Sequence, residues 1–301
     1  MASPEHQALV EILRNQPVLD GATISDKRAG MEDMAGGAPL PEGTVVEVVD
    51  AGGVPAEWLH HQAVPGDVVV LYLHGGGYCI GSVNTHRALA ARLAQACRAR
   101  VLNVDYRLAP EHPHPAAVDD AVAAYRWLLG TGVGPDQVAV GGDSAGGGLV
   151  VATLVSLRDG GDPVPAAGFC LSPWVDLECA GETFDSKADV DPMCTKEGLT
   201  EMAAAYAGGR ELRHPLVSPL HADLAGLPPL LVQVGTAETL LDDSVRLAER
   251  ARAAGVDVRL EAWDDLVHVF QAFAPMVPEA VEAIDGIGAF VRHRLGTEIP
   301  A

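Results

Sequence analysis

The sequence predicts an α/β protein in which helices cover both faces of a mostly parallel sheet. From about residue 68 onward, short apolar runs rich in β-branched residues alternate with stretches of helical pattern. Repeated strand–helix–strand units of this kind form parallel sheets. The chain of 301 residues has the length of one large α/β domain with an insertion, and a domain of that size can bury a substantial core.

The N-terminal 40 residues precede this alternation. Leu9, Ile12 and Leu13 recur at helical spacing, and a second mixed stretch follows a proline. We expect residues 1–40 to form short helices that cover another part of the molecule.

Eight strands are predicted. Residues 44–50 and 54–60 flank Ala51-Gly52-Gly53 and indicate an antiparallel hairpin. Residues 68–73 are apolar throughout, as in a strand that is buried on both faces. The remaining strands are expected at 101–104, 138–140, 166–171, 229–234 and 256–262. Helices are expected at 85–100, 116–129, 241–254 and 278–294, and one more after residue 144.

Residues 176–213 interrupt the alternation. They are rich in charged and small side chains, with a helical patch at 197–206. We expect an insertion that lies over the carboxyl ends of the strands. The main domain then consists of residues 41–175 and 214–301.

Composition restricts the partners and the compartment. The net charge is −21 and the acidic residues are spread along the chain, which argues against nucleic acid or an anionic membrane as a partner. The five cysteines are odd in number and form no CxxC pair, so we expect reduced thiols in the cytoplasm and no metal site. The chain does not open with a basic signal segment, and no apolar run approaches the roughly 20 residues that span a bilayer.

The segment 138–157 predicts a nucleophile on a sharp turn. A buried strand leads into Gly142-Asp143-Ser144-Ala145-Gly146, and an apolar helix follows. Glycines on both sides of Ser144 remove the β-carbons that would collide in a strained strand-to-helix turn. The helix directs its positive end at the place where negative charge would develop. By itself the pattern is also compatible with a glycine-rich loop that caps an ordinary helix.

A second glycine loop follows the strand at 68–73. It reads His74-Gly75-Gly76-Gly77, and such a loop can aim backbone N–H groups at a ligand. Two of these donors and the N–H of Ala145 would form an oxyanion hole. His74 is interpreted as a hydrogen-bonding residue that orients the loop.

The loops after the last two strands carry the acid and the base. A serine hydroxyl needs an imidazole to take its proton, and the imidazole needs a carboxylate. His268 is the only histidine in the loop after the last strand, and Glu238 follows the strand before it. Asp242 and Asp243 remain alternative acids, although we expect them to begin the next helix. The order serine, acid, histidine is that of the α/β-hydrolases.

The chain resembles the bacterial hormone-sensitive-lipase-like (family IV) esterases of the α/β-hydrolase fold. The resemblance covers most of the chain from about residue 40. It rests on four motifs, namely His74-Gly75-Gly76-Gly77, Asp105-Tyr106-Arg107-Leu108-Ala109-Pro110-Glu111, Gly142-Asp143-Ser144-Ala145-Gly146-Gly147 and the loop of His268. Many members carry aspartate as the acid, whereas Glu238-Thr239-Leu240-Leu241 resembles a glutamate-using subgroup.

This resemblance implies a role for each matched residue. Ser144 would be the nucleophile, His268 the base, and Gly76, Gly77 and Ala145 the oxyanion donors, with Gly75 supporting them. It further implies a helical cap made of the N-terminal segment and the insertion, and a dimer joined through the last strand. Read without the family, Asp105 and Arg107 indicate a buried ion pair that braces the oxyanion loop.

The predicted activity is hydrolysis of short- to medium-chain carboxylic esters through an acyl-enzyme, without a metal or organic cofactor. Two alternatives remain at this stage. The same residues would serve a lactone or acyl-peptide hydrolase. A non-catalytic receptor for a small molecule on the same fold is the other, although such a protein would be expected to lack the base.

Overall fold

The computed structural model describes residues 2–15, 22–35, 37–62 and 68–297. Its centre is an eight-stranded sheet of order β1-β2-β4-β3-β5-β6-β7-β8. The strands are β1 Thr44–Asp50, β2 Pro55–His61, β3 Val69–Leu73, β4 Arg100–Val104, β5 Val138–Asp143, β6 Ala167–Leu171, β7 Leu230–Gly235 and β8 Val258–Trp263. β1 and β2 form the antiparallel hairpin, β2 also pairs antiparallel with β4, and all other neighbours are parallel.

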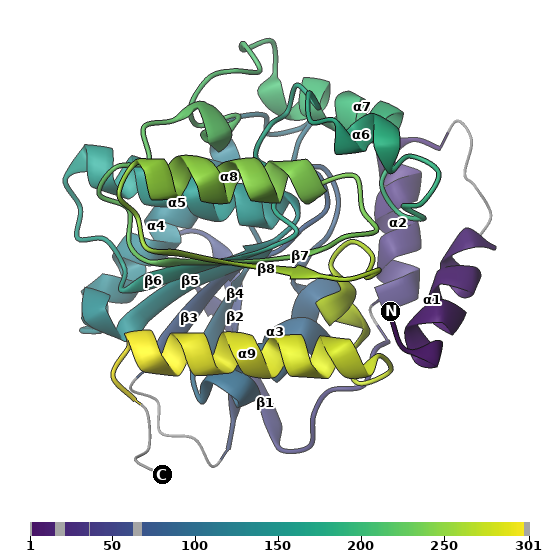
Figure 1. Ribbon diagram of the computed structural model, residues 1–301. Helices are drawn as coiled ribbons and strands as arrows, with labels where there is room; N and C mark the ends of the chain where they lie inside the picture. Colours follow the sequence, from purple (N-terminus) through teal and green to yellow (C-terminus); the bar gives the residue numbers. More distant parts are fainter. Residues whose placement is uncertain (1, 16–21, 36, 63–67, 298–301) are drawn as a thin grey trace.

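Helices cover both faces of this sheet (Figure 1). α4, α5 and α8 lie on one face, and α3 and α9 lie on the other. Their bounds are α3 Val83–Cys97, α4 Ala116–Gly130, α5 Ala145–Gly160, α8 Leu241–Ala253 and α9 Pro278–Arg294. Short 3₁₀ turns are η1 Pro135–Gln137, η2 Pro219–His221 and η3 Phe270–Phe273. The predicted α/β-hydrolase architecture is confirmed, and most element ends lie within two or three residues of their expected positions.

β5 departs most from its predicted length, because it continues beyond residue 140 to Asp143. Gly141 and Gly142 keep the strand in register with β6. A β-carbon on Gly141 would stand 1.9 Å from the ring of Phe169 on that neighbouring strand. The glycine therefore makes room for a large core side chain while the ladder continues.

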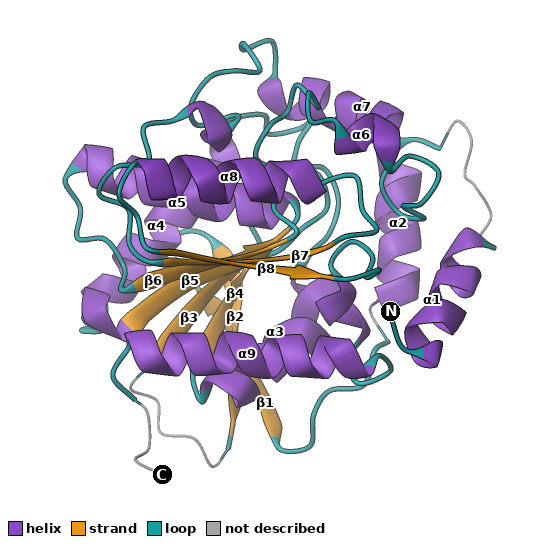
Figure 2. Cartoon of the chain, viewed as in Figure 1, coloured by secondary structure: helices purple, strands orange, loops and turns teal. Residues whose placement is uncertain are grey.

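The four remaining helices gather near the carboxyl ends of the strands (Figure 2). They are α1 Pro4–Arg14, α2 Ile24–Ala35, α6 Thr183–Ser186 and α7 Lys196–Ala207. α1 and α2 come from the N-terminal segment, and α6 and α7 belong to the insertion. No helix among the described residues is long and apolar enough to cross a membrane.

α1 and α2 attach to the rest of the molecule by different means. Leu9 and Leu13 of α1 pack into a cluster with Leu266, Val267 and Phe270, which lie around the loop after β8. Ile12, which the sequence pattern groups with them, is exposed. α2 has no fully buried residue, although Ile24 packs half-buried against the core, so polar contacts contribute more to its attachment.

Candidate active site

Ser144 lies on a strained turn between β5 and α5. Its backbone has φ 52° and ψ −121°, which is unfavourable for a residue with a side chain and is typical of functional sites. Its amide donates to Leu171 O at the end of β6, at 2.8 Å. A β-carbon on Gly146 would lie 2.0 Å from Leu73 O, so the turn needs glycine there. The serine is thereby held above the sheet at the first turn of a helix.

His268 is paired with Glu238. The imidazole Nδ1 lies 2.7 Å from Glu238 Oε2, and both side chains are buried. The other carboxylate oxygen accepts hydrogen bonds from the Ser172 hydroxyl and the Gly235 amide, each at 2.7 Å. A carboxylate held in this way fixes the orientation of the imidazole ring.

The two alternative acids are used elsewhere. Asp243 Oδ2 accepts the backbone N–H groups of Val175 and Asp176, each at 2.9 Å. Asp242 accepts the N–H of Thr183 at 3.2 Å. Both lie in the first turn of α8, as predicted. The structure therefore brings Glu238, and neither aspartate, to His268.

The electrostatics of His268 favour its cation. Burial lowers the pKa of the imidazole, but the interactions with Cys194 and Glu238 outweigh burial and hold the pKa well above its ordinary value. An imidazole in this setting is stabilised when it accepts a proton from a neighbouring hydroxyl.

Ser172 connects the loops that carry these groups, and the sequence reasoning missed it. Its hydroxyl donates to Glu238 and accepts the amide N–H of Val269 at 3.1 Å. It follows β6 directly, as Ser144 follows β5, and Glu238 lies three residues after the end of β7. The same rule that pointed to the other positions, namely to inspect residues just after parallel strands, would have found it.

The glycine loop after β3 presents free backbone donors beside Ser144. Gly76 and Gly77 have φ values of 111° and 58°. Gly75 N–H donates to Asp143 Oδ1 at 3.0 Å, so Gly75 supports the loop and its donor is already occupied. Within the described part of the chain, the N–H groups of Gly76, Gly77 and Ala145 have no hydrogen-bond acceptor.

Asp143 braces this loop. Its carboxylate is buried and accepts the Tyr72 hydroxyl at 2.6 Å as well as the Gly75 amide. His86 Nε2 lies 3.3 Å from it. His74, buried with its pKa lowered to about 3 by desolvation, places Nδ1 2.7 Å from Gly75 O, which fits the predicted orienting role.

The predicted Asp105–Arg107 pair is wrong. Arg107 instead forms a forked ion pair with Asp120 of α4, at 2.7 Å. Asp120 lies in α4, 13 residues after Arg107. The sequence pattern does not show that the start of this helix packs against the loop. The brace of the glycine loop after β3 is Asp143 with His86.

Side chains of the insertion close the site from above. Met202 of α7 lies against Gly77, where an added β-carbon would stand 2.1 Å from the Met202 sulfur. Cys194 also lies near His268, because it contributes to the raised pKa of the imidazole. Neither residue was singled out by the sequence, since nothing in the insertion indicates which of its side chains face the serine.

One cluster has metal-ligating side chains. One ligand atom each from Asp176, Glu178 and His221 lie within 4.8 Å of one another. Arg246 pairs with Asp176 at 2.8 Å and Arg213 with Glu178 at 3.3 Å. Because the arginines already neutralise both carboxylates, the cluster is a salt-bridge network.

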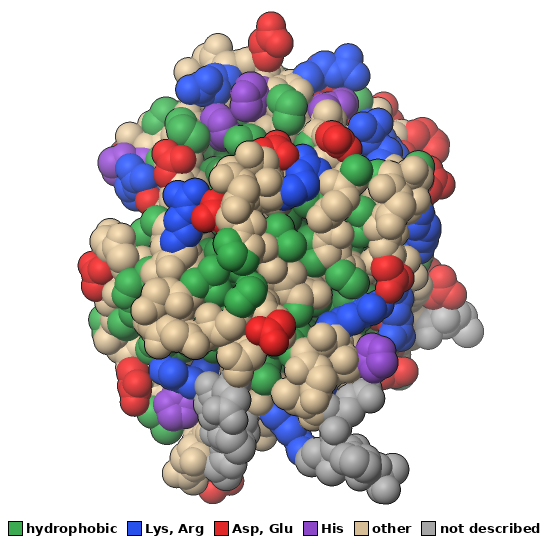
Figure 3. Space-filling view, turned by 90° about the vertical axis from the view of Figure 1, so that its left-hand side faces the viewer, with side chains coloured by type: hydrophobic (Ala, Val, Ile, Leu, Met, Phe, Trp, Pro, Cys, Tyr) green, Lys and Arg blue, Asp and Glu red, His purple; other side chains and the backbone are tan. Residues whose placement is uncertain are grey.

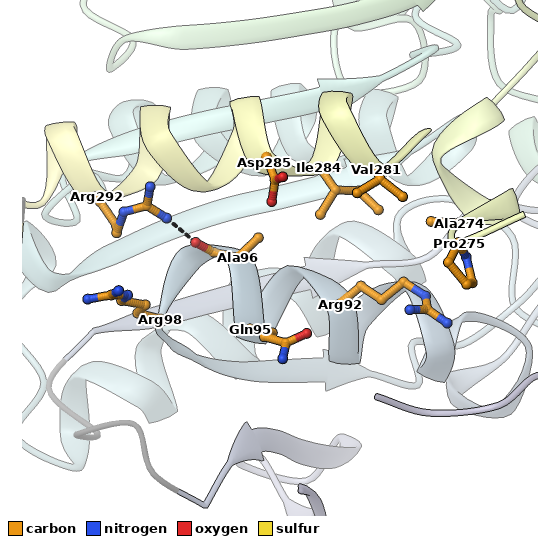
Figure 4. A pocket seen from close by; sticks show the side chains of 10 residues that line it. All are labelled: Arg92, Gln95, Ala96, Arg98, Ala274, Pro275, Val281, Ile284, Asp285 and Arg292. Carbon is orange, nitrogen blue, oxygen red and sulfur yellow. Dashed lines mark hydrogen bonds between the residues drawn. The ribbon is translucent and has the colours of Figure 1, made fainter. Parts of the chain in front are cut away.

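A cavity of about 650 Å³ lies between α3 and α9, away from Ser144 (Figure 4). Arg92, Arg98 and Arg292 line it together with apolar side chains of α9. In the close-up view the guanidinium of Arg92 lies at the opposite end from those of Arg98 and Arg292. The three cations do not converge on one ligand position.

Comparison with known proteins agrees with this geometry. A family model described as the α/β-hydrolase fold matches residues 70–272. An acetyl-hydrolase of Streptomyces hygroscopicus is 43% identical over 299 residues, which are 98% of this chain and 99% of that protein. An esterase of Acinetobacter venetianus is 36% identical, covering 83% of this chain and 84% of its own.

The solved structures give the same result. The crystal structure of an esterase from the bacterial hormone-sensitive lipase family superposes with a TM-score of 0.95 at 53% identity. It covers 98% of this chain and 100% of that one. The chain therefore belongs to the bacterial hormone-sensitive lipase family of esterases, on the α/β-hydrolase fold.

Proposed function

We propose that the protein hydrolyses carboxylic esters of small acyl groups through an acyl-enzyme on Ser144. Ser144 attacks the ester carbonyl while His268 removes its proton, and His268 then protonates the departing alcohol. Water repeats the sequence on the acyl-enzyme. The buried pair of His268 and Glu238, at 2.7 Å, together with the strained backbone of Ser144 after β5, carries this proposal.

The oxyanion of each tetrahedral intermediate would rest on the N–H groups of Gly76, Gly77 and Ala145. Each such donor lowers the barrier by about 3 kcal/mol. The positive end of α5 adds to this field, because the helix begins at the residue after Ser144. None of these steps requires a metal or an organic cofactor.

Short acyl chains fit the covered site. Ser144 is only 7% exposed, and Met202 packs against the oxyanion loop at Gly77. A related protein of Streptomyces hygroscopicus is an acetyl-hydrolase, which supports small acyl groups for this chain also. Medium chains are expected to react more slowly.

The test is a series of p-nitrophenyl esters from acetate to decanoate, assayed with wild type and Ser144→Ala. We expect kcat/KM to peak at two to four carbons, and Ser144→Ala to lose at least about 10⁴-fold of kcat with an unchanged circular dichroism spectrum. Turnover of folded Ser144→Ala near the wild-type rate would refute the serine mechanism. Lactones and acyl-peptides, assayed in parallel, decide whether another acyl bond is preferred.

We further propose that the protein works in the cytoplasm as a homodimer joined through β8. β8 is the outermost strand of the sheet, next to β7, so its outer edge is placed to pair with a second copy. A monomeric mass by light scattering at micromolar concentration would contradict the dimer.

The charge of the protein disfavours nucleic acid as a partner. Acidic and basic side chains are interspersed on the face in Figure 3, and the net charge is −21.

A further inference from the structure

The chain on one side of Glu238 is fixed by the main domain. The amide N–H groups of Thr236 and Ala237 donate to Trp263 O and Leu266 O, at 2.9 and 3.0 Å. Both acceptors lie at or just after the carboxyl end of β8. Hydrogen bonds to β8 and to the loop after it therefore set the path of the chain up to the residue before Glu238.

The chain on the other side of Glu238 is fixed by the insertion. Each polar group of Thr239, the next residue, makes a hydrogen bond to it. The N–H and the hydroxyl of Thr239 donate to Asp191 Oδ2, at 2.9 and 3.1 Å. The carbonyl oxygen accepts the hydroxyl of Thr183 at 2.7 Å. All three residues are buried, so these hydrogen bonds act in a medium of low dielectric, where they are strong.

The carboxylate of Asp191 is the centre of this attachment. Asp191 lies between α6 and α7, and its Oδ1 accepts the N–H groups of Met193 and Cys194 at 2.8 and 3.0 Å. With the two donors of Thr239, the carboxylate accepts four hydrogen bonds. Hydrogen bonds to a charged acceptor are roughly twice as strong as those between neutral groups. Asp191 thus joins a turn of the insertion firmly to the residue after Glu238.

The position of Glu238 matters because its carboxylate orients His268. Glu238 Oε2 lies 2.7 Å from His268 Nδ1. Under the proposed function this contact fixes the tautomer that leaves Nε2 free to take the proton of Ser144. Displacement of a positioned group by about 1 Å can cost about a hundredfold in rate. A change at either anchor of the loop would therefore reach the chemical step through Glu238.

We propose that Asp191 is a positioning residue for the catalytic triad, which acts through Thr239 and holds Glu238 where His268 needs it. The inference rests on the proposed function, because that function assigns Glu238 and His268 to proton transfer. The insertion then has two tasks, since it closes the site from above and also aligns the acid. In a purely structural role, by contrast, Asp191 would stabilise the insertion and leave the contact of His268 with Glu238 unchanged.

The first test is Asp191→Asn, which keeps the shape of the side chain but replaces the carboxylate by a neutral amide. One of its two terminal groups is an NH₂, which cannot accept the N–H groups that it would face. We expect kcat on p-nitrophenyl acetate to fall about tenfold to a hundredfold, with KM within about twofold of wild type and an unchanged circular dichroism spectrum. A folded variant with wild-type kcat overturns the proposal.

Proton NMR measures the contact of His268 with Glu238 without turnover. The proton that Nδ1 shares with a carboxylate gives a resonance at low field, which is assigned by its absence in His268→Ala. We expect Asp191→Asn to move this resonance upfield and to speed its exchange with water. An unchanged resonance, even in a variant of lowered stability, means that Asp191 has a structural role alone.

Thr239 supplies a pair of variants that leaves Asp191 intact. Thr239→Val removes the hydroxyl bond to Asp191 but keeps the shape and the N–H bond, whereas Thr239→Ser keeps both bonds. We expect kcat to fall about threefold to tenfold in Thr239→Val and to stay within about twofold of wild type in Thr239→Ser. Equal activities in the two variants would show that the hydroxyl bond does not hold Glu238, and would contradict the proposal.

Asp243→Asn is the matched control. Asp243 Oδ2 accepts the N–H groups of Val175 and Asp176, each at 2.9 Å. This carboxylate also joins α8 to the start of the insertion, but its hydrogen bonds do not involve Thr239. We expect Asp243→Asn to be less stable in urea, with kcat and the low-field resonance as in wild type. If it lowers kcat as far as Asp191→Asn does, the effect is a general loosening of the insertion and the proposal fails.

Ser144→Ala separates this inference from the proposed function. The variant keeps Asp191, Thr239 and Glu238, so the low-field resonance should persist while hydrolysis is lost. Hydrolysis that continues in Ser144→Ala would refute the proposed function. An unshifted resonance in Asp191→Asn refutes the positioning role alone.

Discussion

At the scale of single residues, the sequence leaves open which acid pairs with His268, and the structure brings Glu238 to it. Three acids, Glu238, Asp242 and Asp243, follow the end of β7 within eight residues. The first lies in the loop and reaches His268, whereas the other two lie in α8 and accept backbone N–H groups. Helix-initiating acids are already recognisable in the sequence, but the path of the loop is a tertiary property.

The first prediction concerns this acid. Glu238→Gln keeps the size of the side chain but cannot hold the imidazole in the tautomer that frees Nε2, so kcat should fall about 10³- to 10⁴-fold with little change in KM. Steady-state kinetics on p-nitrophenyl acetate measure this. Asp242→Asn is the control, because its carboxylate meets only the insertion at Thr183. Loss of activity in Asp242→Asn, with retention in Glu238→Gln, would reverse the assignment.

The second prediction concerns Ser172, whose removal should weaken the hold on Glu238 without removing the acid. Its hydroxyl is one of two donors to Glu238 Oε1 and accepts the N–H of Val269. Ser172→Ala leaves the carboxylate with its Gly235 partner, so we expect kcat to fall by about tenfold to a hundredfold. Stopped-flow measurement of the acylation burst places the loss on the chemical step. A variant as active as wild type would show that Ser172 only fills space.

At the scale of elements, the oxyanion loop depends on residues that have no side chain. Gly77 has φ 58°, and a β-carbon would meet the Met202 sulfur at 2.1 Å. Gly77→Ala should therefore displace the loop and lower kcat about 10²- to 10³-fold. Gly53→Ala, also at positive φ but in open space on the β1–β2 turn, should strain the chain and leave kcat unchanged. Equal activity losses in the two variants would mean that strain alone is responsible.

The elements were largely predictable from the sequence, and the contacts between them were not. Apolar runs such as Val69–Leu73, and the glycines in the turns between such runs, specify strands locally. The parallel order of the strands then places the loop after each strand at the carboxyl edge of the sheet. The contact of Arg107 with Asp120 and that of Met202 with Gly77 join segments whose relative placement depends on packing. The sequence contains no periodic signal for such contacts.

The buried pair of His86 on α3 and Asp143 on β5 makes stability depend on pH. Burial lowers the pKa of His86, but Asp143 raises it above the ordinary 6.5 overall. Burial likewise raises the pKa of Asp143, and His86 with the Tyr72 hydroxyl brings it below 3.8. The charged pair thus stabilises the fold fully between these two ordinary values. Its contribution is lost as pH rises through the raised pKa of His86, or falls through the lowered pKa of Asp143.

Urea unfolding of wild type and His86→Gln checks this coupling. We expect the variant to be less stable by about 3 kcal/mol near pH 6, where both groups are charged. The difference should shrink as pH rises through the raised pKa of His86, because wild-type His86 then loses its proton. A difference that grows between pH 6 and pH 9 would contradict a raised pKa of His86.

At the scale of the whole molecule, the N-terminal segment contributes two helices of different character near the carboxyl ends of the strands. α1 is attached by burial of Leu9 and Leu13 beside the loop of His268. α2 has no fully buried residue; its Ile24 packs half-buried against the core, and side-chain charges supply its other contacts. An apolar attachment is insensitive to salt, whereas ion pairs that are partly exposed are screened by it. The two helices should therefore respond differently to ionic strength.

Arg28 is the main attachment of α2. Its guanidinium is forked on Glu111 at 2.8 and 2.7 Å and also donates to Cys79 O and Ala109 O, next to the oxyanion loop. Lys27 adds a pair with Glu201 of α7 at 2.6 Å. Through these contacts α2 joins the main domain to the insertion. Removal of Arg28 should release the helix while leaving the core intact.

Native-state hydrogen exchange with mass spectrometry tests this. In Arg28→Gln we expect amides of α2 to exchange at least about tenfold faster, and in wild type 1 M salt should produce part of the same effect. Amides of α1 and of the buried helix α5 should stay protected in both cases. Arg126→Gln is the matched control, since its pair with Asp162 is equally short at 2.7 Å and lies far from α2 in the chain. If α2 remains protected in Arg28→Gln, contacts other than this guanidinium hold the helix in place.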